Sequence, residues 1–203
     1  MSSSVAAGEI ARFDAMASRW WDPSGPMRPL HRMNPARIGW VLAQAGRYLG
    51  ATAGLATLDV GCGAGIAAEA LARAGLDVLG IDAAPDVIAA GAAHAEGQGL
   101  PLTYRVAAAE DLCREPARFR LITALEVIEH VADPGPFLAT LAQLAAPGAL
   151  LVLSTLDRSP ASFLAAKVAA EYVLRWLPVG THDWRRFLRP AELAALLRQS
   201  GWR

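Results

Sequence analysis

The sequence predicts an α/β fold, in which a parallel sheet carries helices on both of its faces. Apolar segments of strand length alternate with helix-forming segments, and parallel strands need such helical connections. The first apolar segment also runs through a glycine-rich turn into the helix-forming segment that follows it. With 203 residues, 54% of them hydrophobic, the chain is long enough for one domain with a full core.

Each expected element follows from its local pattern. Strands are expected where apolar residues are bounded by turn residues, at 57–61, 77–82, 102–106, 119–126 and 149–155. Helices are expected at 65–74, 85–97, 133–145, 161–177 and 190–200. Ahead of the sheet, the pattern predicts one amphipathic helix at 9–22 and another that begins near Arg37 and runs to about Tyr48. We therefore divide the chain into an N-terminal helical cap, 1–50, and a sheet domain, 51–203.

Composition argues against several classes of protein. A formal net charge of +0 lacks the broad basic field that holds nucleic acid. The two cysteines, Cys62 and Cys113, have neither metal-type spacing nor a disulfide framework, which fits a reducing compartment. We see no signal peptide pattern and no apolar stretch of about twenty residues that would span a membrane. We expect a cytoplasmic protein without a nucleic-acid partner.

Residues 58–65 form the segment around which the sheet domain is organised. Gly61, Gly63 and Gly65 allow positive φ and let a ligand approach without a Cβ in the way. The helix that follows would present its free N–H groups at this turn. About twenty residues later, Asp82 ends the next strand, where a carboxylate can accept hydrogen bonds from ribose hydroxyls. The pattern predicts a nucleoside-binding site.

The spacing of the glycines and the position of Asp59 narrow the choice of ligand. A dinucleotide fingerprint reads G-x-G-x-x-G, whereas here the third glycine comes one place early and position 66 is Ile66. Asp59 lies inside the strand before the turn, which suits a ligand with an ammonium group better than a pyrophosphate. The arrangement resembles motif I of the Rossmann-like class I S-adenosylmethionine (SAM) methyltransferases. A NAD or FAD site, or a turn without a ligand, is the alternative.

Two further features bear on the same ligand site. Glu110 follows the third strand, where methyltransferases of this class commonly place an acid near the adenine amino group; an exposed acidic loop is the alternative. Glu126, Glu129 and His130 follow the fourth strand at i, i+3 and i+4, which predicts one side of a helical turn. They lie at the carboxyl end of a central strand, where open α/β sheets bind ligands.

The chemistry of these three side chains allows more than one role. Two carboxylates and an imidazole can bind a hard divalent cation such as Mg²⁺, although histidine is not its preferred ligand. Alternatively, His130 acts as a general base on a phenol. In a third interpretation, Glu126 faces the cofactor, Glu129 is solvated and His130 caps the turn.

Residues 161–177 are unusually apolar, and their three charged residues lie four apart on one narrow stripe. A helix of this length extends about 25 Å, which is too short and too charged to span a bilayer. It is expected either to pack on the sheet or in a dimer, or to contact the membrane interface or a lipid tail. His182 follows in a polar loop from which it could reach a substrate.

Taken together, these segments resemble the ubiquinone-pathway O-methyltransferases over residues 9–197. The stretches that carry the resemblance are 17–22, 29–35, the glycine loop, 126–131, 154–158, 180–183, Phe187 and 190–193. The resemblance implies SAM contacts at Arg37, Gly61, Asp82 and Leu125. It also implies Mg²⁺ ligands at Glu126, Glu129 and His130.

The activity implied is methyl transfer from SAM to a phenolic hydroxyl of a polyprenylated ring, in two steps of ubiquinone synthesis. In a metal-free version, His130 or His182 is the base. Implied partners are the polyprenylated phenol or quinol, a ubiquinone-biosynthesis complex, and the inner face of the cytoplasmic membrane, contacted peripherally through 161–177. Two more strands normally follow the last helix of this fold, so the C-terminal part of the sheet is expected to be truncated.

Two other functions stay open at this point. One is SAM-dependent methylation of another small molecule. The other is a non-catalytic, membrane-associated fragment that binds SAM.

Overall fold

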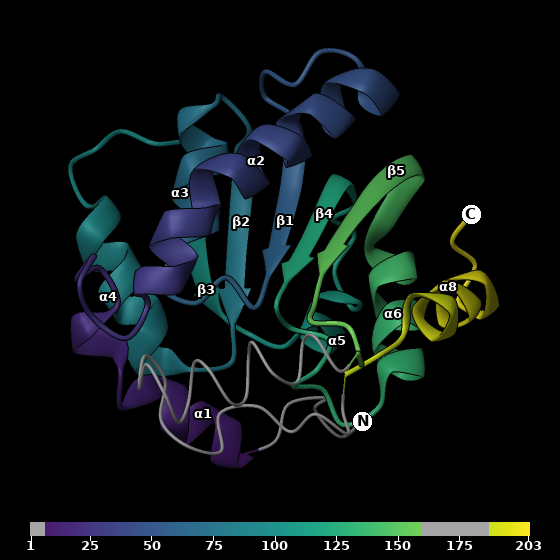
Figure 1. Cartoon of the computed structure of the whole chain (residues 1–203). Helices are drawn as coiled ribbons and strands as arrows, with labels where there is room; N and C mark the ends of the chain where they lie inside the picture. Colours follow the sequence, from purple (N-terminus) through teal and green to yellow (C-terminus); the bar gives the residue numbers. More distant parts are fainter. Residues whose placement is uncertain (1–6, 160–186) are drawn as a thin grey trace.

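A computed structural model of the chain describes residues 7–159 and 187–203 (Figure 1). Five parallel strands form one sheet of order β3-β2-β1-β4-β5. They are β1 (Ala56–Val60), β2 (Asp77–Asp82), β3 (Leu102–Val106), β4 (Phe119–Leu125) and β5 (Ala145–Ser154). The strand order reverses between β1 and β4, and ligands of open α/β sheets bind at the carboxyl ends of the strands beside such a point. The α/β prediction is confirmed.

Helices cover both faces of this sheet. In chain order they are α1 (Ala7–Asp14), α2 (Arg28–Leu49), α3 (Ile66–Arg73), α4 (Pro85–Ala95), α5 (Ala109–Leu112), α6 (Pro134–Leu144) and α8 (Pro190–Gln199). Adjacent residues of β4 show how the faces divide: Leu121 packs in a cluster with residues of α2 and α3, whereas Ile122 packs with residues of α5 and α6. In Figure 1, α6 and α8 lie beside β5.

The N-terminal helices differ from the predicted ones. α1 ends at Asp14, and a 3-10 turn at Ala17–Arg19 (η1) replaces the last part of the expected helix. α2 begins at Arg28, well before Arg37, because Pro29 occupies the first turn, where the N–H that proline lacks has no helical partner. Arg37 therefore lies inside α2 and not at its start.

Three smaller differences concern the edges of elements. The acidic residues after β3 form the short helix α5, so they are not a loop. β5 begins at Ala145, four positions before the expected 149, and a shift in its pairing with β4 accompanies this early start. The predicted helix 161–177 and His182 lie outside the described residues. Within the described part of the chain, none of the helices is long and apolar enough to cross a membrane.

Candidate functional site

The glycine loop joins β1 to α3 at the carboxyl edge of the sheet. Gly61, Gly63 and Gly65 have φ values of 65°, 56° and 91°. Because L residues rarely adopt this region of backbone conformation, the loop requires glycine at these positions. The predicted left-handed turn is confirmed.

Side chains from other parts of the chain occupy the space that a Cβ would need at these glycines. Cζ2 of Trp20 lies 2.3 Å from the ideal Cβ position of Gly63. The Tyr104 hydroxyl lies 1.6 Å from that of Gly65, and a methyl group of Val127 fills the same space at the first glycine. The glycines therefore serve close packing around the loop as well as its conformation. At Gly65, the Tyr104 side chain occupies the volume that a Cβ would fill.

An open pocket lies beside this loop. Its lining comes from η1 and its flanks, α2, β1, the loop, α3 and β4: Trp20, Leu30, Arg37, Asp59, Gly61, Cys62, Gly63, Ile66, Ala67 and Leu125. The predicted site residues found in this lining are Arg37, Asp59, Gly61, Gly63 and Leu125. Of the residues predicted to bind SAM, Gly65, Asp82 and Glu110 lie outside this lining, and so do the predicted metal ligands Glu126, Glu129 and His130.

Asp59 brings a buried acidic group to the pocket wall. It is 2% exposed, and its Oδ1 accepts a hydrogen bond of 2.6 Å from Thr123 Oγ1, its register partner on β4. Its Oδ2 is buried and has no hydrogen-bond partner. Burial raises the pKa of Asp59 to about 6, against the opposing effects of the Thr123 hydrogen bond and the Arg37 charge.

Arg37 brings the opposite charge to the same pocket. Its Nη1 lies 3.8 Å from Glu126 Oε1, and neither Nε nor Nη1 has a hydrogen-bond partner. Buried polar groups are normally paired, so unpaired donors on Arg37 and an unpaired acceptor on Asp59 indicate a ligand that bears both charges. An amino acid, with its carboxylate and ammonium groups, is such a ligand.

Asp82 and Glu110 lie further along the carboxyl edge of the sheet. Asp82 Oδ2 accepts from the Gly63 N–H at 3.0 Å and Oδ1 accepts from the Ala84 N–H at 2.9 Å, so Asp82 ties β2 to the loop. Burial raises the pKa of Asp82. Each carboxylate oxygen keeps a further lone pair for a ribose hydroxyl. Glu110 on α5 has a buried Oε2 without a partner, which leaves an acceptor for an amino group.

The cluster after β4 does not form the predicted helical turn. Glu126 has a φ of 59°, which is uncommon for a residue other than glycine and takes it out of the helical region. A tighter turn follows, in which the His130 N–H donates to the Val127 carbonyl at 2.9 Å. The prediction of a helical turn over Glu126, Glu129 and His130 is therefore wrong.

The two carboxylates of this cluster have hydroxyl partners at the end of β5. Glu126 Oε1 accepts from Ser154 at 2.7 Å, and Glu129 Oε2 accepts from Thr155 at 2.8 Å. Glu129 is 4% exposed, and burial together with the charge of Glu126 raises the pKa of Glu129 to about 7. His130 meets Phe13 of α1 in an edge-to-face contact with ring centroids 5.7 Å apart.

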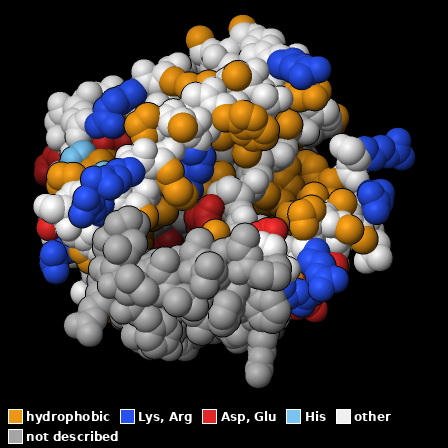
Figure 2. All heavy atoms as spheres, viewed as in Figure 1, with side chains coloured by type: hydrophobic (Ala, Val, Ile, Leu, Met, Phe, Trp, Pro, Cys, Tyr) orange, Lys and Arg blue, Asp and Glu red, His pale blue; other side chains and the backbone are white. Residues whose placement is uncertain are grey.

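A Mg²⁺ ion does not fit these side chains as they are arranged. Among residues 7–159 and 187–203, the structure has no group of three or more His, Cys, Asp or Glu side chains that could hold a metal ion. Both carboxylates after β4 instead accept hydrogen bonds from hydroxyl groups. In the space-filling view, acidic side chains lie recessed in the middle of one face, with hydrophobic side chains on either side (Figure 2).

Trp20 and Thr123 also belong to this site, although the sequence did not predict them as site residues. Thr123 carried a usable signal, because it is a polar residue within an apolar strand and such a residue often pairs with a buried polar group. Nothing in the pattern around Trp20 distinguishes a pocket wall from core packing.

Comparison with known proteins agrees with this fold. Residues 41–203 match the family of methyltransferase domains. Magnesium protoporphyrin IX methyltransferase from Synechocystis PCC 6803, solved with bound S-adenosylhomocysteine (SAH), is similar with a TM-score of 0.63 and 21% identity. The match covers 84% of this chain and 72% of that chain. The plantazolicin methyltransferase BamL is similar with a TM-score of 0.65 and 16% identity, over 96% of this chain and 67% of that one. The fold is that of the class I methyltransferases.

Sequence relatives narrow the family further. The chain is 46% identical over 207 residues to the ubiquinone biosynthesis O-methyltransferase of Cereibacter sphaeroides (strain ATCC 17025), covering 98% of this chain and 84% of that protein. It is 47% identical over 204 residues to the protein of the same name from Caulobacter sp. (strain K31), covering 97% and 81%. The chain belongs to the ubiquinone biosynthesis O-methyltransferase family, as its motifs predicted.

Proposed function

We propose that this protein transfers the methyl group of SAM to phenolic hydroxyls of polyprenylated ubiquinone precursors, at both O-methylation steps of the pathway. The observation that carries the proposal is that Arg37 and Asp59, which have opposite charges, both place atoms without a hydrogen-bond partner on one pocket beside the glycine loop. The family relationship supports the phenolic substrate, because the relatives are named for O-methylation in ubiquinone biosynthesis.

The residues around the pocket divide the recognition of SAM among them. Arg37 would hold the carboxylate of its methionine part and Asp59 the ammonium group. Asp82 would accept from the ribose hydroxyls, and Glu110 would accept from the adenine amino group through its unpartnered Oε2. Leu125, at the end of β4, supplies an apolar wall.

The reaction needs an aligned phenol and a base for its proton. SAM supplies the methyl group: as the new C–O bond forms, the S–C bond breaks and the sulfonium becomes a neutral thioether. The protein contributes alignment, which can account for a large part of such a rate enhancement. We assign the phenol proton to His130, which follows β4 at the carboxyl edge of the sheet and is packed against Phe13. His182, the other candidate base, lies outside the described residues.

No step of this mechanism passes through a metal. The set implied as Mg²⁺ ligands, Glu126, Glu129 and His130, does not fit the ion as arranged, and the phenol can instead be deprotonated by a side chain.

A polyprenylated substrate also suggests contact with a membrane. We propose that residues 161–177 contact the inner face of the cytoplasmic membrane and bind the isoprenoid tail there. The apolar sequence of this segment supports the proposal. Association with other ubiquinone-pathway enzymes is proposed from the family alone. Flotation with liposomes of anionic phospholipid, compared between the wild type and a variant with three added charges within 161–177, tests the membrane contact.

The decisive test of function is methyl transfer from radiolabelled SAM to two acceptors, a demethylated quinol with a short polyprenyl tail and a catechol without one. We expect transfer to the prenylated quinol at the higher kcat/KM, and loss of that activity in Arg37→Ala. Equal use of both acceptors would refute the polyprenyl specificity. Binding of SAM without transfer to any phenol would refute the proposed reaction.

A further inference from the structure

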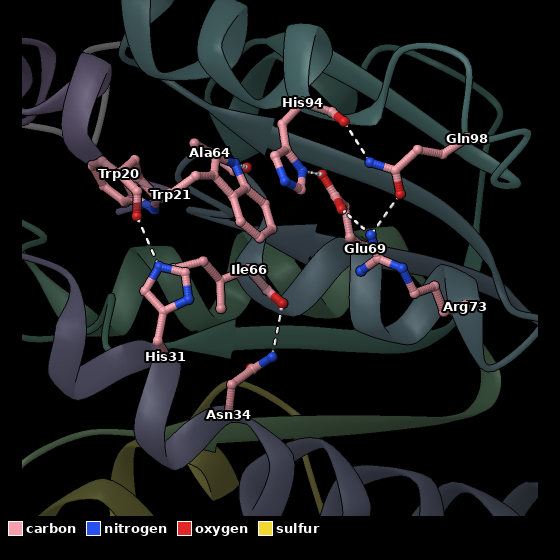
Figure 3. Close-up of polar contacts among 10 residues, drawn as sticks. All are labelled: Trp20, Trp21, His31, Asn34, Ala64, Ile66, Glu69, Arg73, His94 and Gln98. Atoms are coloured by element: carbon pink, nitrogen blue, oxygen red, sulfur yellow. Dashed lines mark hydrogen bonds and ion pairs between the residues drawn. The ribbon is translucent and has the colours of Figure 1, made fainter. Parts of the chain in front are cut away.

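Several side chains between η1 and the first turns of α2 converge on the glycine loop, and the mechanism above uses none of these contacts. Figure 3 shows them: Trp20, Trp21, His31 and Asn34 lie around the backbone of the loop and the start of α3. The residues come from a part of the chain that precedes β1, so the contacts are long-range.

The first contact is made by the ring of Trp20. Trp20 is buried, lines the pocket, and packs against the open side of Gly63. Its own carbonyl is held by His31 of α2, whose Nε2 lies 2.9 Å from the oxygen. The residue is therefore held at two points: its ring lies against the loop, and its backbone carbonyl contacts α2.

The second contact is a hydrogen bond to the loop itself. The indole N–H of Trp21 donates to the Ala64 carbonyl at 3.0 Å. Ala64 is fully buried, so its carbonyl has little access to water as a substitute hydrogen-bond donor. The Trp21 ring also stacks on His94 of α4, with centroids 3.5 Å apart and planes at 5°. The His94 ring is itself held in place, because its Nδ1 lies 2.7 Å from the buried carboxylate of Glu69.

The third contact comes from α2. Asn34 Nδ2 donates to the Ile66 carbonyl at 2.8 Å, at the first residue of α3. Together with Trp21, Asn34 holds carbonyl groups on two sides of Gly65. A loop with three glycines has many accessible conformations. Contacts that hold the loop in its binding conformation before the ligand arrives raise affinity, because binding then costs less conformational entropy.

We propose that Trp20, Trp21, His31 and Asn34 form a clamp that preorganises the glycine loop for SAM, with Trp21 as a positioning residue that acts through the Ala64 carbonyl. The inference rests on the proposed function in one respect, namely that SAM is the ligand of the loop. It assigns a role in donor binding to the chain ahead of the sheet, beyond the direct contacts expected of Arg37.

The test uses Trp21→Phe, which keeps an aromatic ring near His94 and removes the indole N–H together with part of the bicyclic ring. SAM affinity, measured by titration calorimetry on the full chain, should fall about fivefold to tenfold. At saturating SAM, kcat should stay within about twofold, because the phenol and its base are untouched. The matched control is Trp40→Phe, the same chemical change at a 57% exposed position on α2, and it should leave both quantities unchanged.

A second variant, Asn34→Leu, tests the clamp from the other side of Gly65 and should also weaken SAM binding. Because both variants release the same loop, their combination should weaken binding less than the product of the two single effects. A fall in Tm for Trp21→Phe with SAM affinity within twofold of the wild type would overturn the proposal, since the contact would then be structural only. A wild-type protein that does not bind SAM would instead refute the proposed function, and the clamp with it.

Discussion

Replacement of Asp59 by asparagine should stabilise the free protein and weaken its binding of SAM. Asp59 is buried, and burial raises its pKa from 3.8 to about 6. Each pKa unit corresponds to about 1.4 kcal/mol, so keeping this carboxylate ionised in the folded state costs about 3 kcal/mol. Asparagine has nearly the same shape, and its Oδ1 can still accept from Thr123. The variant therefore removes the burial of a charge and keeps the packing.

The stabilisation should depend on pH in a defined direction. The folded pKa of Asp59 is raised, so the folded wild type takes up a proton before the unfolded chain does, and its stability rises as the pH falls through about 6. The advantage of Asp59→Asn should be about 3 kcal/mol near pH 8, about half of that near pH 5, and close to zero below about pH 4. SAM affinity should fall at least about tenfold near pH 8, because the ammonium group loses its carboxylate.

Urea unfolding of both proteins across this pH range measures the first effect, and calorimetry with SAM measures the second. A variant that is less stable than the wild type near pH 8, or a stability difference that does not change with pH, would refute the assignment of a buried ionised carboxylate. Unchanged SAM affinity would refute the contact between Asp59 and the ammonium group.

Three further predictions concern the same site. Arg37→Ala should lower SAM affinity by about tenfold or more in calorimetry, because two guanidinium nitrogens that lack a hydrogen-bond partner are proposed to bind the SAM carboxylate. Wild-type affinity in this variant would contradict the prediction. Gly65→Ala should destabilise the fold by about 2–4 kcal/mol in chemical denaturation, through its positive φ and its collision with Tyr104. Gly97 also has a positive φ but open space around it, so Gly97→Ala should lose less stability than Gly65→Ala. Equal losses of stability would show that contact with Tyr104 does not contribute. Methyl transfer should persist after treatment with EDTA, whereas a loss that Mg²⁺ restores would show that the side chains after β4 rearrange to bind the ion.

The sequence predicted the sheet domain well because its signals are local. Apolar segments bounded by turn residues gave all five strands, and the glycine spacing gave the loop, as the φ values of Gly61, Gly63 and Gly65 confirm. The early start of α2 was missed, because the helix was expected to begin near Arg37 although Pro29 is a good first-turn residue.

The parts of the site that were missed depend on tertiary contacts. A left-handed Glu126 gives no sign in its spacing to Glu129 and His130, which fits a helical turn equally well. The ring of Trp20 lines the pocket through tertiary contacts, because His31 of α2 holds the Trp20 carbonyl while the ring lies against the loop. A pair of adjacent tryptophans in a sequence indicates burial, but it does not say what is buried beneath them.

The filled space at the glycines has a consequence for engineering. Trp20, Tyr104 and Val127 come from the N-terminal segment, from β3 and from the turn after β4, and each fits the surface of one loop. Exchanging that loop for one from another methyltransferase would leave these three side chains facing a shape that they were not selected to match. Transplantation of the donor site should therefore succeed only when the loop and its three covering side chains move as one set.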